Sequence, residues 1–153
     1  MISAFDKLSD PEIEAMLRAP IIACILIAGA DGHVDRKEIQ KAINHTQKSA
    51  TRSKTVLIDY FKLVQEDFED KVKIVLQSLP VGVVERNKLI VDELTGLNSI
   101  LPKLSKAFAT EFYLKMRDLA HQVADSSGGL LGLNRVGDEE AQYVELPMIK
   151  NPA

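Results

Sequence analysis

The chain has few of the features that assign a protein to a class at sight. Its 153 residues include a single cysteine, Cys24, so no disulfide can form within the chain, and a reducing compartment is the simpler setting. Its most apolar run, residues 21–28, is far shorter than the roughly 20 residues that cross a bilayer. The first residues lack the basic and apolar layout of a signal peptide. These absences predict a cytoplasmic protein without membrane insertion.

The charge balance also lacks an excess of one sign. The formal net charge is −3, from 19 basic and 22 acidic residues scattered along the sequence, which argues against the basic face that nucleic-acid binding requires. The sequence has no nucleophile elbow, no phosphate-binding Gly-Lys-Ser/Thr loop and no paired-histidine zinc helix. Cys24 lies among apolar residues, which disfavours a reactive thiolate. We therefore expect no enzymatic activity.

What the chain does have is helical spacing of apolar residues throughout, with no sustained two-residue alternation. Its length fits one domain, residues 1–153. The pattern predicts an all-α fold, a compact bundle of about seven to eight helices without a sheet. Ser9 is expected to cap the first helix, and Pro20 to open a separate second helix. Further helices are expected from Asp35, across residues 57–64, 72–79, 90–101 and 112–125, and from Asp138 to about Pro147.

The most informative segment is residues 30–38, Ala-Asp-Gly-His-Val-Asp-Arg-Lys-Glu, which joins two expected helices. It has the cadence of a calcium-binding loop. In a twelve-residue calcium loop, however, the first and third ligand positions would fall on Ile27 and Gly29, which offer no side-chain oxygen. Asp35 and Glu38 also have the spacing of a helix capping box. The segment is therefore not an EF-hand loop, and both a capping role and a different metal site stay open.

A second acidic junction matches the first. Ala-Asp ends the helix before each junction, at Asp31 and at Asp125, and a Val-x-x-x-Glu spacing follows, ending at Glu38 and at Glu140. Aspartate at a helix C-terminus faces the negative end of the helix dipole, so the position is unfavourable unless positive charge offsets it. If the two junctions lie side by side, their carboxylates converge. Hard divalent ions such as Ca²⁺ or Mg²⁺ prefer such oxygen clusters.

These residues also carry a family resemblance. Residues 25–43, residues 97–101, the helix end at 123–125, the Gly-Gly loop and residues 138–140 resemble the tellurite-resistance TerB-like family. The resemblance covers most of the chain, and its motif-like parts are the two acidic junctions. It implies a compact all-α bundle with a pseudo-duplicated helical unit. It also implies a role in metal-linked stress response, in association with other proteins near the membrane.

The resemblance further implies a ligand set and partners. The family's acidic positions correspond here to Asp31, Glu38, Asp125 and Glu140, with Asp35 and Glu139 as further members. The expected cofactor is a divalent ion, Ca²⁺, Mg²⁺ or Mn²⁺. The expected partners are proteins, among them membrane-associated stress proteins, and a homo-oligomer stays open. The alternative is a non-catalytic helical interaction domain without metal, whose acidic residues cap helices or contact a partner.

Overall fold

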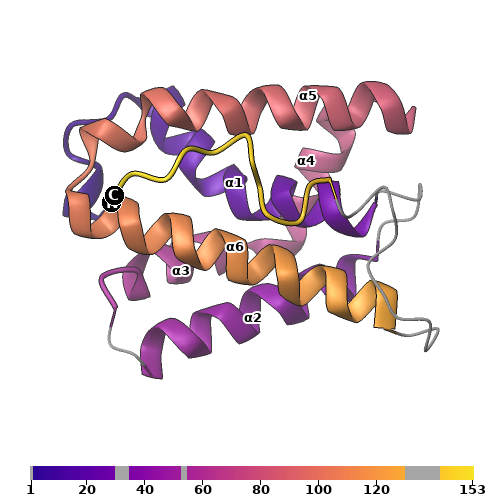
Figure 1. Ribbon diagram of the computed structural model, residues 1–153, viewed down its shortest axis with the longest axis horizontal. Helices are drawn as coiled ribbons and strands as arrows, with labels where there is room; N and C mark the ends of the chain where they lie inside the picture. The colour runs from indigo at the N-terminus through magenta and orange to yellow at the C-terminus, as the bar shows by residue number, and fades with distance from the viewer. Residues whose placement is uncertain (1, 30–34, 53–54, 130–141) are drawn as a thin grey trace.

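The computed structural model describes residues 2–29, 35–52, 55–129 and 142–153. Within these ranges it contains six α-helices and no strand, so the all-α class is confirmed, with fewer helices than the seven to eight predicted. In the view of Figure 1, α1 crosses the middle of the bundle, α5 lies above it, α2 and α3 lie below it, and α6 runs across the front. The helices are α1 (Asp10–Ala28), α2 (Arg36–Arg52), α3 (Ile58–Gln65), α4 (Phe68–Ser78), α5 (Val83–Gly96) and α6 (Lys106–Gly129), with short 3-10 turns η1 (Ser3–Phe5), η2 (Leu97–Ser99) and η3 (Leu101–Lys103).

Helix α1 is the centre of the bundle, because all five other α-helices pack against it. As predicted, Ser9 caps it: the Ser9 hydroxyl accepts the Glu12 N–H at 3.3 Å, and the Glu12 carboxylate accepts the Ser9 N–H at 2.9 Å. The helix then becomes buried on every side from residue 19 to residue 28. Even so, no helix in the described part of the chain is long and apolar enough to cross a membrane.

The prediction that Pro20 opens a second helix is wrong, because α1 continues through it. Proline has no N–H, so the carbonyl of Met16, four residues earlier, lacks its usual helical donor. The hydroxyl of Tyr60, on α3, donates to that carbonyl at 2.5 Å, and both residues are fully buried. A bond from a distant part of the sequence thus fills the gap that proline leaves, and two predicted helices become one.

The other helices bury the apolar stripes predicted for them, but two boundaries differ. Helix α5 ends at Gly96, where the prediction continued to residue 101, and the turns η2 and η3 follow it. Pro102 cannot donate the N–H that an α-helix would need there. The tighter 3-10 turns still bring Leu97 and Leu101 into the core. Helix α6 runs on to Gly129, past the predicted end near residue 125.

The C-terminal segment, residues 142–153, packs as an irregular strap and passes between α5 and α6 in Figure 1. The predicted last helix is wrong in its described part, since residues 142–145 form turns, and Asp138 lies outside the described residues. Asn98 anchors the strap: its amide donates to the Met148 carbonyl at 2.9 Å and accepts the Lys150 N–H at 2.8 Å. The strap adds three side chains to the core, those of Val144, Leu146 and Ile149.

Five of the eight aromatic residues gather in one cluster. Phe5 of η1 and Tyr60 of α3 both meet Phe108 of α6 edge to face, with ring centroids 6.0 and 5.7 Å apart. Tyr60 also contacts Phe61 and Phe112 in the same way. Each edge-to-face pair of this kind contributes roughly 0.5–1.5 kcal/mol of stability beyond what the burial of its apolar area contributes. The cluster therefore ties the N-terminal turn to two helices distant in sequence.

Candidate functional site

The described parts of the two acidic junctions lie at the same end of the bundle. Helices α2 and α6 pack against each other in opposite directions, so the first turn of α2 lies near the last turns of α6 (Figure 1). Asp35 precedes α2, Glu38 is in its first turn, and Asp125 is four residues before the end of α6. Three of the six predicted ligands therefore come from elements that meet at this end, which we call the acidic end.

Asp35 acts as the cap of α2. One of its carboxylate oxygens, Oδ1, accepts the Lys37 N–H at 2.9 Å and the Glu38 N–H at 3.4 Å. These are donors that the first turn of a helix cannot satisfy internally. Asp35 is exposed and Glu38 is half-buried. The capping role predicted for Asp35 is thus present in the structure, whatever else the residue binds.

Asp125 lines a polar cleft between α2 and α6 with a volume of about 250 Å³. Two histidines, His45 of α2 and His121 of α6, also line it, as does Asp118. The Lys115 ammonium crosses the cleft to donate to the Ser49 hydroxyl at 3.0 Å. His121 lies 2.8 Å from a carboxylate oxygen of Glu145 in the C-terminal strap. The cleft therefore offers both acidic and basic groups to a polar ligand.

The complete predicted ligand set is not brought together in the described residues. Asp31, Glu139 and Glu140 lie outside them. Among the residues that the structure does describe, no group of three or more histidine, cysteine, aspartate or glutamate side chains could hold a metal ion. A divalent ion at the acidic end would thus need ligands from residues 30–34 or 130–141 beside those of Asp35, Glu38 and Asp125.

The structure adds a residue that the sequence analysis missed. Arg86, in the first turns of α5, is only 7% exposed, and its guanidinium donates to the Gly29 carbonyl at the end of α1. Arginine is seldom so deeply buried unless it is paired. Gly29 directly precedes the Ala30-Asp31 pair of the first junction. Arg86 thus places a fixed positive charge beside the start of the acidic segment. A signal was present in the sequence, since Arg86 continues the stripe of Ile90 and Leu94 at four-residue spacing.

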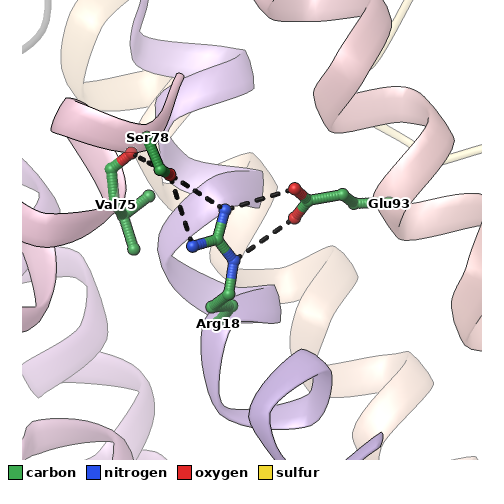
Figure 2. Close-up of polar contacts among 4 residues, drawn as sticks. All are labelled: Arg18, Val75, Ser78 and Glu93. Atoms are coloured by element: carbon green, nitrogen blue, oxygen red, sulfur yellow. Dashed lines mark hydrogen bonds and ion pairs between the residues drawn. The ribbon is translucent and has the colours of Figure 1, made fainter. Parts of the chain in front are cut away.

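A second arginine, Arg18, ties α1 to two other helices, as Figure 2 shows. Its guanidinium binds both carboxylate oxygens of Glu93 on α5, at 3.2 and 3.3 Å, and lies 3.4 Å from the Ser78 hydroxyl of α4. Ser78 in turn donates to the Val75 carbonyl at 2.7 Å. Arg18 and Glu93 are both partly exposed, so the pair contributes modest stability. The Glu93 carboxylate and the Ser78 hydroxyl account for the position of the Arg18 guanidinium.

Cys24 is fully buried in α1, as predicted from the apolar residues around it. Burial raises the pKa of the Cys24 thiol far above its ordinary value. The thiolate, which is the nucleophilic form, is therefore strongly disfavoured.

Comparison with known proteins places the chain in a family. It is 32% identical over 117 residues to a protein of Methanothermobacter thermautotrophicus described as "Uncharacterized protein ORF11'", and the match covers 73% of this chain and 72% of that protein. The chain belongs to the family of this archaeal protein. No model of a protein family matches the chain, and no solved structure matches it. The family is thus defined by sequence over most of both chains.

Proposed function

We propose that the protein is a TerB-like stress-response module that binds a divalent cation at the acidic end and acts through protein partners. The ion is Ca²⁺, Mg²⁺ or Mn²⁺, and the protein works in the cytoplasm beside membrane-associated stress proteins. The two acidic junctions belong to a duplicated helical unit. The ligands are carboxylates from both junctions, Asp31, Asp35 and Glu38 from the first and Asp125, Glu139 and Glu140 from the second.

The observation that supports this proposal is the meeting of α2 and α6 at the acidic end. The described residues of the two junctions, Asp35 and Glu38 on one side and Asp125 on the other, lie about 90 residues apart in the sequence and come to one end of the bundle. The end of α6 is the negative end of its dipole, which favours a cation near Asp125. The first turn of α2 has the opposite sign, so Asp35 and Glu38 must supply enough negative charge to offset it. Oxygen ligands of this kind suit hard divalent ions.

The test is a titration of the metal-free protein with Ca²⁺, Mg²⁺, Mn²⁺ and Zn²⁺, in which calorimetry measures ion binding and thermal unfolding measures stability. A bound ion at a hundredfold excess over its Kd should raise the free energy of unfolding by about 2.7 kcal/mol. The double variant Asp31→Asn with Glu140→Gln removes one carboxylate from each junction and should abolish the response. The metal proposal is refuted if no ion has an effect, or if the effect survives the double substitution.

Two further variants separate metal binding from helix capping. Asp35→Ser keeps a good N-cap for α2, because serine and aspartate cap about equally well, but it removes the carboxylate charge. Asp118→Asn is the matched control, since Asp118 lines the same face of α6 two turns before Asp125. We expect Asp35→Ser to weaken ion binding without destabilising the metal-free protein, and Asp118→Asn to change neither. An equal loss of binding in both variants would point to bulk charge and not to a site.

The second candidate function is a helical interaction domain without metal. Two contacts favour it: Asp35 already caps α2, and the buried Arg86 supplies positive charge at the acidic end. On this hypothesis, Asp31→Asn with Glu140→Gln abolishes binding of a purified protein partner and leaves the response to metal ions unchanged. The titration therefore distinguishes the two candidates.

A further inference from the structure

A cavity of about 410 Å³ opens where η3, the start of α6 and the end of the C-terminal strap meet. In Figure 1 this is the end of the bundle at which the strap reaches the first turn of α6. Its walls are mostly apolar, and they come from η3, from α6 and from the strap: Leu101, Pro102, Leu104, Ala109 and Pro152. The two leucines and the alanine are buried and form its floor. Sites for small molecules have this range of volume and this mostly apolar lining, with a few polar groups among it.

The charged side chains that line this cavity are both basic. They belong to Lys106, the first residue of α6, and to Lys150 of the strap. In the described part of the chain neither forms an ion pair, whereas the neighbouring Lys103 is paired with Glu12 at 2.6 Å. Because Lys106 begins a helix of 24 residues, the positive end of the α6 dipole lies at the same wall. A cavity lined in this way favours an anionic group.

The wall that the strap contributes is held in place by Asn98, which lines the cavity as well. The Asn98 amide donates to the Met148 carbonyl and accepts the Lys150 N–H, so both of its polar atoms are engaged with the strap. The backbone of Lys150 is thereby fixed at the cavity. Its long side chain can cover apolar surface with its stem and keep the ammonium at the mouth. The polar groups left for a ligand are therefore the two ammonium groups and the start of α6.

We propose that this cavity binds a small amphiphile that carries an anionic oxygen group, a carboxylate or a phosphate, on an apolar chain. The apolar chain lies on the floor of the cavity, and the anionic group meets Lys106 and Lys150. Along α6 the site lies about 28 Å from Asp125, at a rise of 1.5 Å per residue. It therefore does not depend on the cation proposed at the acidic end, and either proposal can fail without the other.

The test measures the binding of octanoate, octyl phosphate, hexanoate and uncharged octanol to the metal-free full chain, by calorimetry at physiological salt. One molecule of octanoate or of octyl phosphate should bind per chain, and the tighter of the two identifies the anionic group. Hexanoate should bind about fifteenfold more weakly than octanoate, because each buried CH₂ group strengthens binding about fourfold. Octanol should bind at least about tenfold more weakly than octanoate, because it lacks the charge that two ammonium groups would meet.

The variants Lys106→Met and Lys150→Met remove one ammonium each and keep a long apolar side chain. Each should weaken octanoate binding about twofold to fivefold, as loss of an exposed ion pair does, and the two together about tenfold. Lys103→Met is the matched control, because Lys103 lies at the same end, does not line the cavity and is paired with Glu12. It should leave the Kd unchanged. Octanoate should also slow hydrogen exchange of the Lys150 amide, which is bonded to Asn98.

Three results would overturn the inference. The first is that neither anion binds. The second is that octanol or hexanoate binds as tightly as octanoate, which would leave the charge or the apolar floor without a role. The third is that loss of both lysines changes the Kd no more than Lys103→Met does, which would place the anion elsewhere on the protein.

Discussion

Removing one oxygen atom, in the variant Tyr60→Phe, should destabilise the protein far more than its size suggests. The Tyr60 hydroxyl is the donor to the Met16 carbonyl, which Pro20 leaves without a helical partner. Phenylalanine keeps the ring and its edge-to-face contacts but leaves the buried Met16 carbonyl without a hydrogen-bond donor. An unsatisfied buried carbonyl costs about 1–3 kcal/mol. For a chain of this length, each 1 kcal/mol corresponds to a fall in Tm of about 2–4 °C.

The physical reason can be isolated with the variant Pro20→Ala. Alanine restores an N–H at position 20, which can donate to the Met16 carbonyl as in an ordinary helix. In that background Tyr60→Phe should cost less than about 1 kcal/mol, because the carbonyl keeps a donor. The double-mutant cycle should therefore show a coupling free energy of about 1–2 kcal/mol between two residues 40 positions apart.

Urea unfolding, monitored by circular dichroism, gives the free energy of unfolding of all four proteins, provided that the slope of the transition is the same for each. Equal costs of Tyr60→Phe in the wild-type chain and in the Pro20→Ala variant would refute the explanation for the continuity of α1. The hydroxyl would then contribute through general packing, and some other group would satisfy the Met16 carbonyl.

Two smaller predictions concern titratable groups. The pKa of Glu12 is lowered, chiefly by the Lys103 ammonium at 2.6 Å and then by the Ser9 N–H. The ionised Glu12 carboxylate therefore stabilises the folded protein above the ordinary glutamate pKa, and this stabilisation is lost as the pH falls through the lowered value. Wild type should therefore unfold at a higher temperature than Glu12→Gln at pH 6 and at the same temperature at pH 2, and a difference that persists at pH 2 would contradict this. The raised pKa and full burial of Cys24 predict no reaction of the native chain with a disulfide-forming thiol reagent at pH 8, and reaction of one thiol per chain in urea. A native reaction at the unfolded rate would show that α1 opens.

The sequence pattern was sufficient to predict the helical class and most of the buried stripes, because the positions of the apolar residues directly reveal a repeat of about 3.6 residues. It was insufficient at Pro20, where proline normally marks a helix start. The outcome there depends on Tyr60, and a local pattern holds no information about a donor 40 residues away. The same limit explains why the predicted last helix is wrong: Val144 and Leu146 are buried in the core, but the backbone around them forms turns and not a helix.

The candidate site shows the same division. The capping role of Asp35 could be predicted, because capping is local and the two donors, the N–H groups of Lys37 and Glu38, lie two and three residues further on. The sequence analysis could state the meeting of α2 and α6 only as a condition, because the antiparallel packing of two helices depends on the whole bundle. Arg86 was missed because a charged residue on an apolar stripe looks like an error in the stripe. One of the partners that accompany its burial is the Gly29 carbonyl at the end of α1, far from Arg86 in the sequence.

The C-terminal strap has a practical consequence for cutting this chain. Phe5 near the beginning and Ile149 near the end belong to one buried cluster, together with the side chains of all six α-helices. A fragment that stops after α6 would keep the six described α-helices and still lack three core side chains, which would leave apolar surface exposed to association with other molecules. The shortest piece that contains every buried core residue in the described part of the chain runs from residue 5 to residue 149. Any tag, fusion or limited proteolysis of this protein has to respect those two positions and not the ends of the helices.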